Sequence, residues 1–217
     1  MVRSMKPPAA GKEKILSAAE HLFAAEGYHG ASMRKITRNA GVELGLSTYH
    51  FRNKDDLYQQ VLLRRAPEMA GALSAALDGL PVDARGSEGV AAILEAYVDA
   101  HLERLTCGDG GWRSYLQLAA ETGLLLHRSE LSQSAAQHYG PVLQRYKVAL
   151  MTAAGGGNHA EFDRRFHIFQ GAVLSLIPEA AETKIAKGGT AGGRDLLAQS
   201  VVDTFTGAFL SVATSRG

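Results

Sequence analysis

Cysteine is nearly absent from the chain, which holds a single one, Cys107, among 217 residues. One cysteine excludes an internal disulfide and a zinc site made of several cysteines. Long apolar runs are also missing, since no stretch approaches the roughly 20 consecutive apolar residues that a membrane-spanning helix needs. Residues 1–11 contain Arg3 and Lys6 but no apolar segment after them, so no secretory signal is predicted. We therefore expect a cytoplasmic protein with no membrane partner.

Recognisable catalytic and metal-binding patterns are missing as well. The histidines are scattered, and none stands in a His-Glu-x-x-His or comparable spacing. Glycine-rich stretches at 79–89, 108–111, 155–157 and 188–193 lack the Gly-Lys-Ser/Thr ending of a phosphate loop, so they are interpreted as linkers. Cys107 is open to two interpretations, a nucleophile or redox sensor and an incidental thiol beside a glycine stretch. We predict no catalytic residue, no metal site and no cofactor.

Charge is divided unevenly along the chain. The whole chain has a net charge of +1, but residues 1–65 carry +5 and the remainder carries −4. A basic head on a mildly acidic body favours a DNA-binding end and a non-binding end. Ordinary fluctuation in composition accounts for the division about as well, so the interpretation depends on a motif.

Apolar residues recur at helical spacing almost everywhere, and strand-like alternation is hard to find. We predict an all-α chain of about nine helices without internal repeats. The fourth helix begins near Asn53, is ended or kinked by Pro67 and resumes over 68–80. The other helical stretches are expected at 12–26, 33–40, 44–51, 90–106, 112–127, 129–153, 160–182 and 194–213.

Local signals mark several helix ends in the first 60 residues. Gly27 is expected to end the first helix, because glycine readily adopts the positive φ found beyond a helix C-terminus. Ser32 and Asn53 are good N-caps for the second and fourth helices. Asp55 and Asp56 then stand in the first turn of the fourth helix, where the helix dipole favours a negative charge.

The first three helices have the layout of a helix-turn-helix. Gly41 is expected to form the tight turn between the second and third helices, and Val42 is expected to pack into the core. The third helix ends in Thr48, Tyr49 and His50, polar groups able to reach phosphates and base edges. The small hydrophobic centre is predicted to contain Leu22, Phe23, Ile36 and Phe51. By itself this pattern is only moderately specific.

The full stretch resembles one family. Residues 15–28 (ILSAAEHLFAAEGY) resemble the first helix of TetR-family repressors, and residues 32–42 (SMRKITRNAGV) resemble their second helix and turn. Residues 49–57 (YHFRNKDDL) are similar to the segment that joins the recognition helix to the fourth helix. The resemblance covers about residues 12–63 and implies two domains. These are a three-helix DNA-binding domain at 1–54 and a helical effector-binding and dimerisation domain at 55–217.

The resemblance implies a set of DNA-binding residues. Arg34 would reach a base edge, most plausibly guanine, and Tyr49, His50 and Lys54 would hold phosphates. Two positions depart from the family, which usually has an aliphatic residue at Ser47 and a tyrosine at Thr48. The apolar Leu44 and Leu46 indicate contact with thymine methyls. The complete set is Ser32, Arg34, Lys35, Leu44, Gly45, Leu46, Thr48, Tyr49, His50 and Lys54.

The body is expected to hold an effector pocket and a dimer interface. Within the pocket the segment 112–115 is the preferred location, because a tryptophan beside a loop often closes a pocket mouth. The effector-binding candidates are Tyr97, His101, Trp112, Tyr115, Leu116, Tyr139, Tyr146, Phe166, Phe169 and Gln170. The dimer-interface candidates on the last two helices are Phe162, Phe169, Val173, Leu197, Val201, Phe205 and Phe209.

The function predicted from these features is that of a DNA-binding transcriptional regulator, not an enzyme. As a homodimer it would repress from a palindromic double-stranded operator until a small, largely apolar or aromatic effector releases it. The alternatives are a helix-turn-helix regulator without a small-molecule effector, controlled by a protein partner or by abundance, and an enzyme. Activation instead of repression also remains open, because the sequence does not say where the operator lies.

Overall fold

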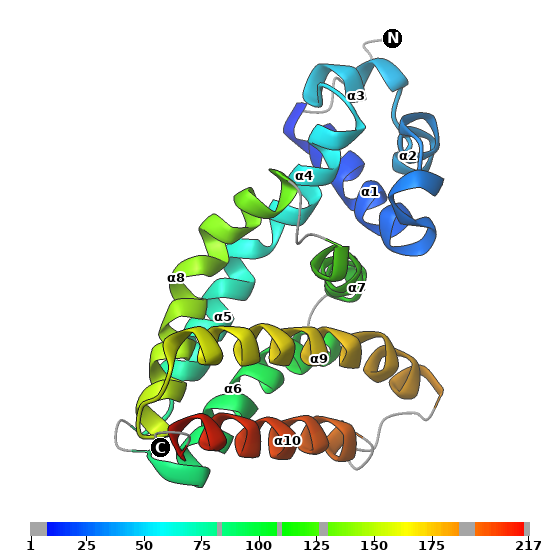
Figure 1. Cartoon of the computed structure of the whole chain (residues 1–217). Coiled ribbons are helices and arrows are strands. Elements are labelled where there is room, and N and C mark those ends of the chain that lie inside the picture. The colour runs from blue at the N-terminus through cyan, green and yellow to red at the C-terminus, as the bar shows by residue number, and fades with distance from the viewer. Residues whose placement is uncertain (1–7, 82–83, 108–109, 126–129, 187–193, 215–217) are drawn as a thin grey trace.

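The structure is a computed structural model that describes residues 8–81, 84–107, 110–125, 130–186 and 194–214. Within these ranges every regular element is a helix, which confirms the expected all-α class (Figure 1). Arg3 and Lys6, and the side chain of Cys107, lie outside what is described. The helices are α1 (Pro8–Gly30), α2 (Met33–Ala40), α3 (Leu44–His50), α4 (Lys54–Arg64), α5 (Ala66–Asp78), α6 (Gly86–Cys107), α7 (Gly110–Leu125), α8 (Glu130–Ala153), α9 (His159–Ala186) and α10 (Arg194–Thr214).

The predicted signals for helix ends in the first 80 residues are confirmed, although α1 begins at Pro8 instead of residue 12 and α5 covers Ala66–Asp78 instead of 68–80. Gly27 interrupts α1 with a positive φ of 69°, and Gly41 ends α2 in the left-handed region with a φ of 64°. The Ser32 and Asn53 side chains cap α2 and α4 by accepting hydrogen bonds from backbone N–H groups. Pro67 lies in the first turn of α5, where no intrahelical donor is needed, so α4 ends at Arg64 and a new helix begins.

Helices α1, α2 and α3 form a head at one end of the molecule, and α4 runs from the head toward the body (Figure 1). The head core contains residues from α1, α2 and α4, including the four predicted core residues Leu22, Phe23, Ile36 and Phe51. Leu57, Val61 and Leu62 of α4 belong to the same core, so the predicted domain boundary at residue 54 crosses a shared hydrophobic cluster. The boundary itself stays a prediction.

The body consists of α5 to α10. Helices α5 and α8 lie side by side along one side, and α6, α9 and α10 pack together at the end far from the head (Figure 1). Helix α7 lies between the two parts and packs against both α1 and α9. Its Leu118 is buried in the head core, whereas its Trp112, Tyr115 and Leu116 belong to the body core. One helix therefore joins the two hydrophobic cores.

Candidate nucleic-acid interface and sensor region

Helix α3 turns one face outward from the head. Tyr49 is 77% exposed and Leu44 is 39% exposed, and Gly45 and Thr48 share this exposed face. Ser47 is fully buried and donates a hydrogen bond to the carbonyl of Leu44 at 2.7 Å. An exposed helix face with a glycine and short or polar side chains can approach base edges closely in a major groove.

Leu46 does not share this exposed face. It is partly buried in the head core, and its Cδ2 lies 2.6 Å from the position that a Cβ on Gly11 of α1 would occupy. Gly11 therefore makes room for Leu46, and the leucine joins α3 to α1. Of the two leucines predicted to contact thymine methyls, Leu44 is the one that is exposed for such a contact.

The N-terminal turn of α2 carries three of the predicted DNA-binding residues. Arg34 is exposed, and the exposed Ser32 uses its hydroxyl to accept a hydrogen bond from the Lys35 N–H. The Lys35 ammonium forms an ion pair with Glu26 of α1 at 2.5 Å. Among these three, Arg34 offers the most accessible charge for DNA.

Lys54 has a structural task that the sequence did not suggest. Its ammonium donates hydrogen bonds to the backbone carbonyls of Tyr28, at 2.9 Å, and Ala31, at 3.2 Å. It also lies 4.1 Å from the centre of the Tyr28 ring, a favourable cation–π position. These contacts attach the start of α4 to the end of α1. An ammonium has three N–H donors, and these two bonds leave one for a phosphate. The predicted contact of Lys54 with DNA stays a prediction.

His50 is partly buried between two neighbouring rings, with its centroid 4.9 Å from that of Tyr49 and 6.1 Å from that of Phe51. Its Nε2 is buried and has no hydrogen-bond partner within the part of the chain that the structure describes. The His50 ring thus packs against its chain neighbours. Its predicted contact with a phosphate stays a prediction.

Arg38 and Arg52 are exposed cations on the head that the sequence reasoning did not include. Arg52 follows the recognition helix directly, and its side chain is 85% exposed while pairing with Asp56 at 3.5 Å. Arg38 lies exposed in the last turn of α2. The excess of positive charge in residues 1–65 was the signal that pointed to such residues.

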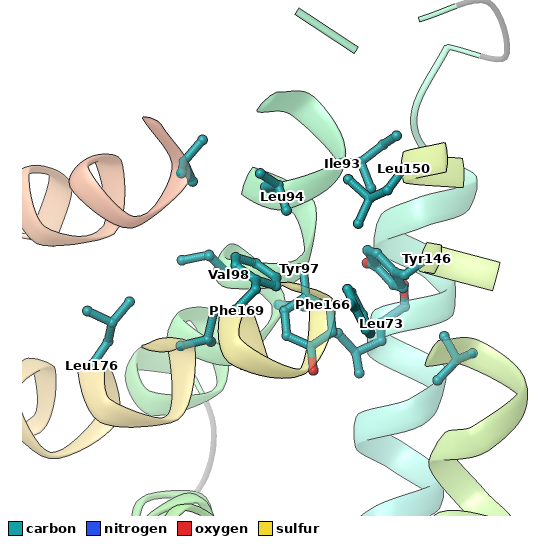
Figure 2. Packing of buried hydrophobic residues seen from close by; sticks show 14 of the residues in the cluster. Leu73, Ile93, Leu94, Tyr97, Val98, Tyr146, Leu150, Phe166, Phe169 and Leu176 are labelled. Carbon is teal, nitrogen blue, oxygen red and sulfur yellow. The ribbon is translucent and has the colours of Figure 1, made fainter. Parts of the chain in front are cut away.

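The predicted effector-binding residues gather in the body core. Figure 2 shows Tyr97 of α6 close to Phe166 and Phe169 of α9, with Tyr146 and Leu73 nearby. The ring centroid of Tyr97 lies 5.1 Å from that of Tyr146, 5.3 Å from that of Phe169 and 5.8 Å from that of Phe166. His101, one turn along α6, is 4.8 Å away. These side chains form one buried aromatic cluster.

The polar atoms of this cluster are paired within the chain. The Tyr97 hydroxyl accepts a hydrogen bond from Gln170 at 3.2 Å, and the hydroxyls of Tyr115 and Tyr139 lie 2.8 Å apart. Burial raises the pKa of Tyr115 to about 12, and it lowers the pKa of His101 below its usual value. The cluster is therefore neutral near neutral pH, which suits an apolar or aromatic ligand better than an ionic one.

Trp112 lies in a different environment from that expected for a residue at a pocket mouth. It is buried at the start of α7, and the guanidinium carbons of Arg65 and Arg104 lie 4.9 and 5.0 Å from its ring centre. Its ring also meets Tyr115 edge-on at 5.5 Å. Trp112 thus lies where the head meets the body.

Several dimer-interface candidates are enclosed by their own chain. Phe162, Phe169, Val173 and Phe209 are buried, and the rings of Phe162 and Phe209 stack at 5.5 Å between α9 and α10. Side chains that are buried in the monomer have little surface left for a second chain. Leu197, Val201 and Phe205 retain exposed surface. Among the side chains of these helices that the structure describes, the largest apolar exposure is at Ile168, 61% exposed, and Leu196, 80% exposed, which the sequence reasoning did not select.

Two family profiles match the chain. Residues 15–61 match the family described as bacterial regulatory proteins, tetR family, and residues 95–208 match the tetracyclin repressor-like C-terminal domain. The chain belongs to the tetR family. The first match covers most of the head and much of α4. The second begins within α6, includes α7, α8 and α9, and ends within α10. Proteins of this family are transcriptional regulators, not enzymes.

Curated relatives of this tetR-family chain match about a quarter of it. The HTH-type transcriptional repressor AcnR of Corynebacterium jeikeium (strain K411) is 37% identical over 62 residues, which are 27% of this chain and 33% of AcnR. The HTH-type transcriptional regulator UidR of Escherichia coli (strain K12) is 34% identical over 53 residues, 24% of this chain and 27% of UidR. The chain thus spans about a third or less of the length of these relatives.

Solved structures of the family match almost the whole chain in fold. A tetR-family transcription regulator from Shewanella sp. PV-4 has a TM-score of 0.63 and 20% identity, with 91% of this chain and 97% of that chain covered. The transcriptional regulator FadR of Bacillus subtilis, solved in complex with stearoyl-CoA, has a TM-score of 0.59 and 18% identity, with 90% and 98% covered.

No cluster of metal-binding side chains and no membrane-spanning helix occurs among the residues that the structure describes.

Proposed function

We propose that the chain is a transcriptional repressor that binds a palindromic operator as a homodimer and is released by a small, largely apolar or aromatic effector. The observation that carries this proposal is the exposed face of α3, where Leu44, Gly45, Thr48 and Tyr49 lie on the surface of a head whose helices α2 and α4 are capped. Family membership and the repressor named among the relatives support the same function.

The head offers two kinds of DNA contact. Leu44 and Arg34 are positioned to read base edges, because both are exposed near the start of their helices. Tyr49, Arg38 and Arg52 are further exposed groups of the head that could bind phosphates and fix the register on the duplex. Two heads would read half-sites one helical turn apart, about 34–36 Å from centre to centre.

For the dimer we propose the outer face of α9 and α10. Ile168, Leu196 and Leu197 expose apolar surface on these two helices, and the small Gly171 and Gly207 have no atoms within 4 Å of a hypothetical Cβ. Exposed apolar groups next to small residues allow two helix pairs to pack closely. This set replaces the buried phenylalanines in the interface that we propose.

For the effector we propose the aromatic cluster around Tyr97. Its neutral, mostly apolar side chains favour an apolar ligand, and the hydroxyls of Tyr97, Tyr115 and Tyr139 supply the few polar anchors that such sites use. FadR of Bacillus subtilis, of similar fold, was solved with stearoyl-CoA, so a long-chain acyl-CoA is a reasonable first probe.

One observation favours a second candidate. The polar groups of the aromatic cluster are already paired with one another, as expected in a closed core. A regulator that lacks a small-molecule effector and responds to a protein partner would have such a core. A probe that releases operator DNA in a binding assay would favour the effector-controlled repressor. DNA binding that no small-molecule probe changes would favour the regulator controlled by a protein partner.

The test of DNA binding is a selection of duplexes by the purified full-length protein, followed by affinity measurements on the selected site. A palindromic site is expected, with affinity falling roughly 10³-fold or more between about 50 and 200 mM salt. The variant Arg34→Ala should lose affinity for that site, whereas Arg145→Ala, which removes an exposed cation on α8, should not. Absence of any selected site would contradict the proposal.

A further inference from the structure

A group of charged and aromatic side chains fills the junction between the head and the body. Glu20 of α1 is 1% exposed and lies 3.4 Å from Nε of Arg65, the residue between α4 and α5, and 3.5 Å from Nη1 of Arg64. The Arg65 guanidinium in turn lies against the Trp112 ring of α7. On the same ring lies Arg104 of α6, which pairs with Glu68 of α5 at 3.1 Å. We call Glu20, Arg65, Trp112 and Arg104 the junction cluster.

The backbone of α7 is seated directly on this cluster. A Cβ at Gly111 would overlap Nη2 of Arg65 and lie 2.7 Å from Oε1 of Glu20. A side chain at this position would force the ends of the Arg65 and Glu20 side chains to move. The position of α7 and the position of the ion pair therefore depend on each other.

Charge makes the arrangement sensitive to displacement. Burial raises the pKa of Glu20, and the nearby Arg65 and Arg64 oppose this effect. A buried carboxylate that loses an arginine partner is costly, because its burial is then less well compensated by charge. A shift of α1 relative to the α4–α5 junction that separates Glu20 from Arg65 is thus resisted more strongly than the sliding of an apolar contact.

Helix α7 is bound to both parts of the molecule. Toward the head, Ser114 bonds to His21 at 2.8 Å, and Gln117 donates to the carbonyl of Ala24 at 3.2 Å. Toward the body, Tyr115 packs against Trp112 and its hydroxyl lies 2.8 Å from that of Tyr139 on α8. Side chains of α7 therefore contact both the head and the body.

We propose that the junction cluster sets the orientation of the DNA-binding head relative to the body. This inference rests on the proposed DNA-binding function. It requires that weakening the cluster leaves each head able to bind DNA but loosens the geometry with which two heads span an operator.

The test compares Arg65→Lys and Gly111→Ala with the control Asp78→Asn in the full-length protein. Arg65→Lys keeps the charge but loses the flat stacking surface, and Gly111→Ala displaces the ion pair. Asp78 pairs with Arg145 on an exposed surface between α5 and α8, away from the junction. Affinity is measured for the selected operator, for a duplex with one half-site, and for operators whose half-site spacing is changed by one base pair.

Both junction variants are expected to bind the full operator about tenfold more weakly than the wild type, within the usual size of coupling between sites. Their half-site affinity should be unchanged, and their discrimination against altered spacing should fall. Asp78→Asn should match the wild type in all three assays. Trp112 is the only tryptophan of the chain, so its emission should shift to the red and be quenched more by acrylamide in the junction variants.

Two results would overturn the inference. Equal losses on the full operator and on the half-site would mean that the cluster only stabilises the head. Unchanged operator affinity and spacing preference, in variants whose tryptophan emission confirms an opened junction, would mean that the cluster does not orient the head. A wild-type protein that selects no operator overturns the proposed function itself, which distinguishes that failure from failure of the inference.

Discussion

Leu44 and Leu46 stand two positions apart on α3 and have different surroundings. Leu44 is exposed, whereas Leu46 packs against α1 beside Gly11. The sequence assigned both to the DNA surface, because no local signal tells which side of a seven-residue helix faces the core. Packing of α3 against α1 determines which face of α3 is exposed. This contact joins residues far apart in the sequence.

The two leucines provide a matched pair of substitutions. Leu44→Gln is expected to leave stability and general DNA affinity intact and to change the selected base sequence, because Gln favours adenine over a thymine methyl. Leu46→Gln is expected to lower stability by about 1–2 kcal/mol through burial of an unpaired amide. Site selection and urea unfolding measure the two effects. An unchanged selected sequence for Leu44→Gln would remove the leucine from base reading.

Lys54 is expected to contribute to stability as well as to DNA binding. Lys54→Ala removes two hydrogen bonds to carbonyls and the contact with the Tyr28 ring, so the free energy of unfolding should fall by about 1–2 kcal/mol. Arg52→Ala, which removes a highly exposed cation, should change it by less than about 0.5 kcal/mol. Urea unfolding of the two variants checks this, and equal stabilities would contradict the role given to Lys54.

Among the helices, those whose ends carry local signals were predicted well. Gly27, Ser32, Gly41, Asn53 and Pro67 act through their own backbone or through a neighbour three positions away, so the sequence contains the required information. The contacts of Lys35 with Glu26, of Lys54 with Tyr28 and of Trp112 with two arginines join different helices. These depend on how helices pack, which a single sequence does not reveal.

Periodicity also failed to distinguish the two sides of α9 and α10. The apolar stripe with Phe162 and Phe209 is the inner side, and the outer side has only scattered apolar residues such as Ile168 and Leu196. Apolar residues that face the core and apolar residues that face a second chain recur at the same helical spacing. The sequence reasoning therefore assigned the larger apolar side chains to the dimer interface. Burial in the structure separates them.

The outer face of α9 and α10 gives a prediction for assembly. Ile168→Glu and Leu196→Glu should each weaken the dimer, because a charge would be buried against apolar surface of the second chain. Val148→Glu is the control, since Val148 is an exposed valine on α8. Sedimentation equilibrium should give monomer for the first two variants at concentrations where the control is dimeric. Dimers of unchanged strength in all three would place the interface elsewhere.

At the scale of the whole molecule, the head and the body have separate hydrophobic cores that share α7. Leu118 belongs to the head core, while Trp112, Tyr115 and Leu116 on the same helix belong to the body core. The buried ion pair of Glu20 and Arg65 ties the two parts together further. Unfolding one core therefore exposes surface of the other.

We expect one cooperative thermal transition for the wild-type chain in calorimetry, despite its two cores. The midpoint should rise with protein concentration, because association stabilises the folded dimer by mass action. Leu118→Asp should lower the midpoint and separate the transition into two, since it breaks the contact through which the cores share α7. Two transitions in the wild type would contradict the shared-helix account.

The place of Leu118 in the head core also bears on how such regulators are recombined. A chimera that grafts this DNA-reading end onto the sensor of another regulator leaves a hole beneath α1 and α4 unless an apolar side chain arrives from the new seventh helix. Exchanging the few exposed residues of α3 should thus change operator preference with less loss of stability than transplanting the whole DNA-binding head. Fusions cut immediately after α4 are the ones we expect to be insoluble.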